Sequence, residues 1–234
     1  MLRLDHVKRF YRLLDTLDER LAGARRLADC SGRMSWPKRG IYLFREPGET
    51  RTDSGVGPRI IRVGTHALKE GSGTTLWNRL SQHKGQVHSG GGNHRGSIFR
   101  LTVGTALIEK GGLDCSTWDN RRGVASREVR ESERPLEMAV SKVIGEMPFL
   151  WLAVADEPGP TSLRGYIERN AIALLSNCAR QPIDPPSPSW LGLHCSRQKV
   201  RDSGLWNSNH VTERYDPAFL DTLADMISRA EPTQ

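Results

Sequence analysis

Apolar residues recur every three or four positions between residues 4 and 29, and charged side chains fill the positions between them. This spacing is typical of a helix with one apolar face, and Gly23 is a place where that helix could break. The same spacing in LRGYIERNAIALLSN, residues 163–177, predicts a second amphipathic helix. The segment DPAFLDTLADMISRA, residues 216–230, predicts a terminal helix.

Two short apolar runs, GIYLF at 40–44 and IIRVG at 60–64, are rich in β-branched and aromatic residues. A long polar loop separates them, so they predict an antiparallel hairpin. PFLWLAVA, residues 148–155, is almost uninterruptedly apolar and predicts a central strand buried on both faces. IFRLTVGTALI, residues 98–108, predicts strand or mixed structure.

Helix-capping and helix-breaking residues predict the structure of the remaining segments between residues 74 and 147. TTLWNRLSQHKG, residues 74–85, begins with threonines suited to capping and ends in glycine, as a short helix does. Residues 85–97 contain five glycines and predict a loop. A charged helix follows from about Ser126, and Pro135 is expected to break or restart it.

Composition limits the class of protein. The chain has 234 residues with 37% hydrophobic content, enough for one core, and its net charge of +7 favours polyanionic partners, although an ordinary basic soluble protein is the alternative. The four cysteines lie far apart, which argues against a zinc ribbon or a disulfide scaffold and for reduced thiols. No apolar run reaches the ~18–20 residues that span a bilayer, and the charged N-terminus is unlike a signal peptide, so we expect a cytoplasmic protein without a membrane partner.

Two candidate features carry chemistry. Arg79 and His83 are four residues apart and therefore share one helical face. A guanidinium can hold a phosphate oxygen while an imidazole relays a proton, although such a pair can also be solvated on a surface helix. Glu168 lies at the edge of an apolar stripe, where a carboxylate is expected to bind a metal or to form a rim salt bridge with Arg164.

The order of these features resembles the GIY-YIG nuclease superfamily. It comprises Gly40-Ile41-Tyr42, a second strand ending in RVG, a helix with Arg79 and His83, the strand FLWLAV and a lone glutamate in YIERNAIALL. The resemblance covers residues 38 to about 177. It implies an α/β (α+β) fold, with a small antiparallel sheet of about three core strands flanked by helices.

The resemblance also suggests a division of the chain. An N-terminal helical segment, 1–35, would pack on a GIY-YIG-like core, 36–180, and a loop-rich extension with the terminal helix would follow at 181–234. The glycine-rich loop and charged helix of residues 85–146 would be an insertion in the core.

Residue by residue, the resemblance implies a single-metal site. Tyr42 matches the signature tyrosine that contacts or activates the attacking water, Arg79 the arginine that steadies the phosphate, and Glu168 the glutamate that binds one divalent cation. His83 falls where some restriction-enzyme members have an additional catalytic His or Tyr. One carboxylate plus water is the usual way of holding Mg²⁺ at phosphoryl sites, and Mn²⁺ is the other candidate.

The chain departs from the family pattern in its motif spacing, which the loop EPGETRTDSGVGPR enlarges, and in its second motif. The second motif is Arg62-Val63-Gly64, so its tyrosine is replaced by an arginine, which can hold phosphate but cannot act as a base. The family also has an asparagine soon after the metal-binding glutamate. Asn177, Asn207 and Asn209 are the candidates, and Asn207 is favoured.

Further basic residues are candidates for contact with DNA. His94 and Arg95, in GGGNHRGSIFR, could lie on phosphates if the glycine-rich loop enters a groove, or the loop could simply be solvated. Lys84 is expected to follow the backbone together with Arg62 and Arg95. The loop lacks the G-K-[ST] ending of a nucleotide P-loop, so no nucleotide cofactor is predicted, and the histidine spacing does not fit zinc.

The sequence therefore predicts a metal-dependent endonuclease that hydrolyses DNA phosphodiester bonds. Because the second signature tyrosine is missing, a catalytically silent nucleic-acid-binding or adaptor module with the same fold is the alternative. A protein-interaction domain with incidental basic charge is a third possibility.

Overall fold

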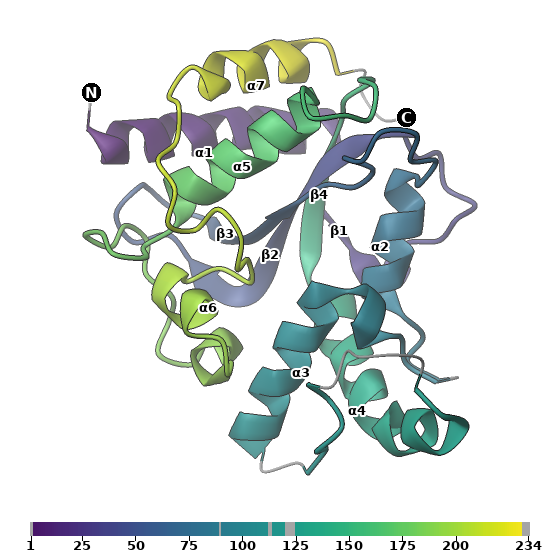
Figure 1. Cartoon of the computed structure of the whole chain (residues 1–234). Coiled ribbons are helices and arrows are strands. Elements are labelled where there is room, and N and C mark those ends of the chain that lie inside the picture. The colour runs from purple at the N-terminus through teal and green to yellow at the C-terminus, as the bar shows by residue number, and fades with distance from the viewer. Residues whose placement is uncertain (1, 89, 112–113, 120–124, 231–234) are drawn as a thin grey trace.

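A small antiparallel sheet between two groups of helices forms the centre of the protein in a computed structural model, which describes residues 2–88, 90–111, 114–119 and 125–230 (Figure 1). The strands are β1 (Arg25–Arg26), β2 (Gly40–Thr50), β3 (Pro58–Gly64) and β4 (Pro148–Ala153). Their order in the sheet is β1-β4-β2-β3. The predicted hairpin and central strand are thus confirmed, and the two-residue β1 extends the three core strands at one edge.

Apart from the short helix α6 (Gln198–Ser203), the helices lie in two groups on either side of the sheet (Figure 1). The helices of the described residues are α1 (Arg3–Arg20), α2 (Leu76–Lys84), α3 (Ile98–Gly111), α4 (Arg127–Gly145), α5 (Leu163–Leu175), α6 (Gln198–Ser203) and α7 (Phe219–Ser228), with short 3-10 turns η1 (Leu27–Asp29), η2 (His94–Gly96) and η3 (Leu191–His194). Helices α1, α5 and α7 pack together, whereas α2, α3 and α4 form the other group. No helix of the described residues is long and apolar enough to cross a membrane.

The register of β2 with β3 determines which side chains share a face of the sheet. Tyr42 pairs with Gly64, and Phe44 pairs with Arg62. Because side chains alternate along a strand, these four positions lie on one face. The ring of Phe44 lies 5.4 Å from the ring of Phe99 of α3, so this face is the one covered by the second helix group.

Each of three predicted helices begins after a Thr or Ser whose hydroxyl caps its first turn. Thr75 accepts a hydrogen bond from the backbone N–H of Asn78, Ser126 from Val129, and Ser162 from Gly165. Each cap satisfies one of the backbone donors that the first helical turn leaves unpaired.

Two expectations for the insertion were wrong. Residues 98–108 belong to helix α3 rather than to a strand. Nearly every side chain from Phe99 to Ala106 is buried, so the segment shows no helical period in its hydrophobicity although it is helical. Pro135 neither breaks nor restarts α4, which runs through it.

The C-terminal extension packs against the hairpin. The indole N–H groups of Trp190 and Trp206 both donate to one carboxylate oxygen of Glu46, each at 3.0 Å. The backbone N–H of Trp206 also donates to the carbonyl of Ile61 in β3, at 2.7 Å. These contacts place residues 206–207 beside β3, next to the candidate site.

Candidate active site

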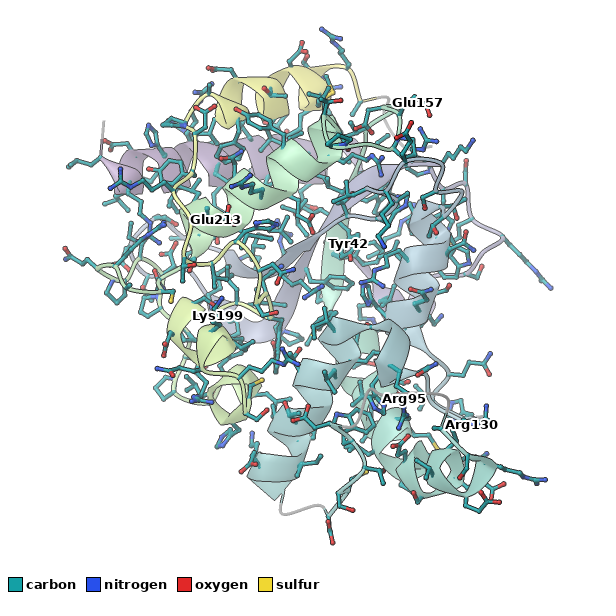
Figure 2. The ribbon with its side chains drawn as sticks, viewed as in Figure 1. Tyr42, Arg95, Arg130, Glu157, Lys199 and Glu213 are labelled. Atoms are coloured by element: carbon teal, nitrogen blue, oxygen red, sulfur yellow. The ribbon has the colours of Figure 1, made fainter. Side chains whose placement is uncertain are left out.

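Tyr42 lies in the middle of the sheet, between the two helix groups (Figure 2). Its side chain is 1% exposed, and its ring crosses over Gly64 of the neighbouring strand. A Cβ atom at position 64 would overlap the Tyr42 ring and hydroxyl. The glycine of the RVG motif is therefore needed because it leaves room for the phenol of the GIY motif.

A chain of two hydrogen bonds runs from this phenol to Ser97, which precedes helix α3. The Tyr42 hydroxyl lies 2.8 Å from Nε2 of His83, and Nδ1 of His83 lies 2.8 Å from the hydroxyl of Ser97. His83 and Ser97 are fully buried. The imidazole thus connects a tyrosine on β2 with a serine that begins α3, and the His83 side chain is not solvated.

The surroundings of His83 favour the neutral imidazole. Burial lowers its pKa well below the ordinary value, and the positive charges of Arg79, Arg62 and Arg100 lower the pKa further. His83 is therefore neutral at pH 7, so one ring nitrogen donates and the other accepts.

Arg62 lies beside the same phenol. Its guanidinium donates to the carbonyl of Trp206 at 2.7 Å, lies 4.6 Å from the centre of the Phe99 ring and interacts electrostatically with Tyr42. Burial lowers the Arg62 pKa, whereas Tyr42 and Glu168 raise it. Arg62 therefore interacts electrostatically with both the phenol and the carboxylate.

Arg79 is half-buried on α2, one turn before His83. Its guanidinium donates to the side-chain oxygen of Gln82 at 2.9 Å and to the carbonyl of Gly96 at 3.1 Å. Its positive charge lowers the pKa of both Arg62 and His83. Arg79 therefore adds to the positive potential around Tyr42.

Glu168 enters this cluster from α5. One carboxylate oxygen, Oε1, accepts the backbone N–H of Thr65 at 3.1 Å, and the other accepts no hydrogen bond among the described residues. Burial raises the Glu168 pKa, an effect opposed by Arg62, His210 and Arg79. The alternative of a salt bridge to Arg164 is wrong, because Arg164 pairs with Asp156.

The donor set at Glu168 fits one hard cation held mostly by water and phosphate oxygens. In the part of the chain that the structure describes, no three His, Cys, Asp or Glu side chains gather as a protein-only metal cage. Mg²⁺ at phosphoryl sites is commonly held by one or two carboxylates together with substrate and water. Oε2 of Glu168 is the protein atom available for this purpose.

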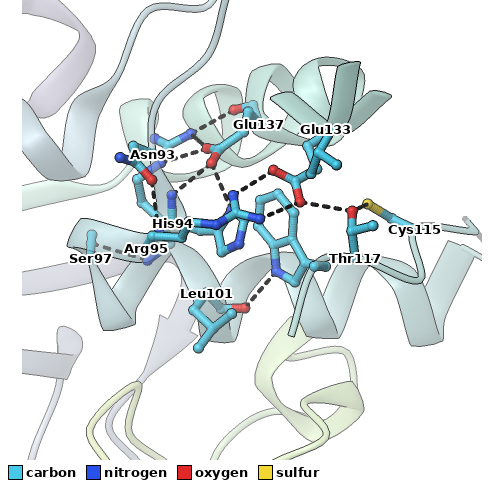
Figure 3. A network of polar contacts seen from close by, with 12 residues as sticks. Asn93, His94, Arg95, Ser97, Leu101, Cys115, Thr117, Glu133 and Glu137 are labelled. Carbon is cyan, nitrogen blue, oxygen red and sulfur yellow. Dashed lines mark hydrogen bonds and ion pairs between the residues drawn. The ribbon is translucent and has the colours of Figure 1, made fainter. Parts of the chain in front are cut away.

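The basic residues predicted to contact DNA mostly have other partners. His94 is fully buried, stacks on Trp118 with ring centres 3.9 Å apart and lies 3.0 Å from Glu137, so the prediction that it contacts a phosphate does not fit its position. Arg95 forms two hydrogen bonds with Glu133, as Figure 3 shows. The glycine-rich segment packs against α4 through these pairs, which contradicts the predicted arm into a DNA groove.

Lys84 and Asn207 are also bound within the protein. The Lys84 ammonium donates to the carbonyls of Ala28 and Cys30. The Asn207 amide accepts the N–H of Val63 at 3.1 Å and donates to the carbonyl of Val63 at 2.8 Å. Asn207 thus continues the hydrogen bonding of the sheet edge beside Arg62, rather than presenting its amide to a ligand.

Sequence reasoning missed Ser97 and Thr65. The backbone N–H of Arg100 donates to the Ser97 hydroxyl, which makes Ser97 a cap for α3. A serine before a helix is a recognisable signal, but the β-branched residues that follow favoured a strand there. Thr65 acts through its backbone N–H, so no side-chain pattern could reveal it.

Comparison with known proteins gives one match. A family model described as GIY-YIG domain matches residues 1–233. Neither the curated proteins nor the solved structures gave a match. The family match thus extends beyond the segment 38–177 on which the sequence motifs lie.

Proposed function

Because the chain belongs to the GIY-YIG domain family, whose function is generally of nuclease type, we propose that it is an endonuclease that hydrolyses DNA phosphodiester bonds with one divalent cation. The observation that carries this proposal is the direct contact between the Tyr42 hydroxyl and a buried, neutral His83. Three charged side chains near this pair interact electrostatically with it or with one another: Arg62, Arg79 and Glu168. The role of each residue follows from that arrangement.

Tyr42 and His83 form the proton-accepting pair. As water attacks the phosphorus, its proton passes to the Tyr42 oxygen, and the Tyr42 proton passes to Nε2 of His83. The bond from phosphorus to the leaving sugar oxygen then breaks, and that oxygen takes up a proton from solvent water. The second proton transfer occurs within hydrogen-bond distance, since the phenol already contacts the imidazole.

Substrate binding makes His83 a better proton acceptor. Arg79 and Arg62 lower the pKa of His83 in the free protein, in addition to the effect of burial. A phosphodiester bound beside these guanidiniums brings a compensating negative charge, so the His83 pKa rises when the scissile phosphate is in place. The pair is thus activated by the substrate itself.

Arg79 and Arg62 stabilise negative charge that develops on the phosphate. Both are donors only and stay charged at neutral pH, so they can hold phosphate oxygens and offset the charge of the transition state. Arg62 also interacts electrostatically with Tyr42, so its positive charge can stabilise negative charge on the phenol oxygen. In this role the arginine replaces the missing second tyrosine.

Glu168 would hold the cation, Mg²⁺ or Mn²⁺, through Oε2. When bound, the cation supplies Lewis-acid polarisation of a phosphate oxygen. The Thr65 N–H fixes the orientation of the carboxylate by holding Oε1. Burial raises the pKa of this half-buried carboxyl, and the positive charges of Arg62 and Arg79 oppose that rise and favour the carboxylate.

The test is cleavage of supercoiled plasmid and of branched DNA with Mg²⁺. We expect Glu168→Gln to abolish cleavage, whereas Glu157→Gln, at a carboxylate with 90% side-chain exposure, retains the wild-type rate. Equal cleavage by Glu168→Gln and wild type would contradict the assignment. Binding without cleavage by the wild type, across several metals and DNA structures, would favour the silent nucleic-acid-binding module.

A further inference from the structure

The segment of residues 85–146 contacts helix α2, which carries Arg79 and His83, at two points. The Ser97 hydroxyl contacts Nδ1 of His83, and Nη1 of Arg100 donates to the backbone carbonyl of His83 at 2.9 Å. Both residues are fully buried. The insertion therefore holds the side chain and the backbone of His83 at the same time.

Helix α4 fixes the position of this segment. Arg100 donates to the side-chain oxygen Oε2 of Glu137 at 2.9 Å and to the backbone carbonyl of Glu137 at 2.7 Å. Glu137 also accepts the backbone N–H of His94, at 2.7 Å, within the network of Figure 3. A Cβ atom at Gly91 would overlap Glu137, and one at Gly92 would overlap the Arg100 guanidinium. The glycines thus permit the close packing that places Ser97 beside His83.

The hydrogen bonds of His83 with Tyr42 and with Ser97 together determine the tautomer of its imidazole. The Tyr42 hydroxyl is buried, so its proton needs an acceptor within the protein. Among the described residues, that acceptor is Nε2 of His83. In a neutral imidazole the proton is then on Nδ1, and it is donated to the Ser97 hydroxyl.

We propose that Ser97 is a positioning residue that holds His83 in the Nδ1-protonated tautomer, so that Nε2 is free to accept the proton of Tyr42. Its effect on cleavage rests on the proposed nuclease function, but the tautomer is a property of the folded protein without substrate. Residues 85–146 are thereby part of the active site, although they contribute no group that touches the phosphate.

The experiment measures imidazole ¹⁵N chemical shifts at pH 7 in full-length protein labelled on histidine, with the His83 signals assigned through His83→Gln. These shifts distinguish a protonated from an unprotonated ring nitrogen. We expect protonated Nδ1 and unprotonated Nε2 in the wild type, and a change to the opposite or a mixed pattern in Ser97→Ala. Protonated Nε2 in the wild type, or an unchanged pattern in Ser97→Ala, would overturn the proposal.

Two matched variants separate positioning from folding. Ser141→Ala removes the hydroxyl of another fully buried serine, which has no hydrogen-bond partner among the described residues, and should keep the wild-type pattern. Ser97→Thr retains a hydroxyl and should keep the wild-type pattern as well. If Ser141→Ala changes the pattern as much as Ser97→Ala does, the effect comes from general loosening and the proposal fails.

Cleavage provides the second readout. We expect Ser97→Ala to lower kcat about 10- to 100-fold with KM unchanged, because a buried Nδ1–H would lose its acceptor. If no variant and no wild type cleaves DNA, the proposed function fails while the ¹⁵N shifts still decide the role of Ser97. If the wild type cleaves and Ser97→Ala cleaves equally fast, the role of Ser97 fails alone.

Discussion

Arg62 stands where the resemblance to GIY-YIG nucleases leads us to expect a second tyrosine. A second phenol would be neutral in the position that Arg62 occupies, whereas the guanidinium adds a positive charge next to Tyr42, Glu168 and His83. That charge lowers the His83 pKa and requires His83 to be a neutral acceptor. The sequence revealed the substitution, but its consequence depends on which side chains the sheet register brings together.

The charge around His83 predicts a shift in Arg79→Gln. Burial is the largest cause of the low His83 pKa, and Arg79 is the largest of the charges that lower it. Removing that charge should raise the His83 pKa, so the midpoint of a ¹⁵N-detected pH titration moves to higher pH. Arg33→Gln, at an exposed arginine, should leave it in place. A midpoint that stays or falls in Arg79→Gln would show that Arg79 does not act on His83.

Helix α4 shows what sequence patterns can and cannot predict about an element. Its start at Ser126 was predicted, because a capping serine is a local signal. Its continuation through Pro135 was not, because tertiary contacts outweigh the local cost: buried Glu133 and Glu137 bind Arg95 and Arg100 on either side of the proline. Glutamates in a charged run look solvated in a sequence, and only the packed insertion reveals their partners.

Helix α4 also offers a stability comparison between two carboxylates. Glu137→Gln leaves the fully buried Arg100 without its charged partner, and we expect a loss of about 3–5 kcal/mol in the free energy of unfolding. Glu131→Gln breaks an exposed pair with Arg127 and should change that free energy by about 0–1 kcal/mol. Urea denaturation measures both. Equal losses would mean that the buried network does not stabilise the insertion.

The fold as a whole was predictable where local signals and family motifs coincide. The hairpin, the central strand and the helices that carry Arg79 and Glu168 follow from periodicity, caps and turns. Helix α3 was missed because burial on all sides hides its period, and the packing of Asn207 on β3 was missed because no local pattern specifies a contact 144 residues away in the sequence. The types of residue in the site could therefore be predicted, whereas the residues that hold them in place could not.

The net charge of +7 predicts salt-dependent binding to DNA. With Glu168→Gln protein, which should bind without cleaving, log Kd should rise steeply with log salt, by about 0.9 for each phosphate contact. Adding Arg79→Gln should reduce that slope by about one, because one phosphate contact is lost. Fluorescence anisotropy over a salt series measures this, and a Kd independent of salt would argue against backbone contact.

The most direct test is single-turnover nicking of supercoiled plasmid with Mg²⁺ by Tyr42→Phe. Removing the hydroxyl that contacts His83 should slow nicking about 100-fold or more. Tyr166→Phe removes a hydroxyl that contacts Asp216 on the protein surface and should nick at the wild-type rate. If Tyr42→Phe nicks as fast as the wild type, Tyr42 does not activate the nucleophile, and the proton-accepting role of the Tyr42–His83 pair is wrong.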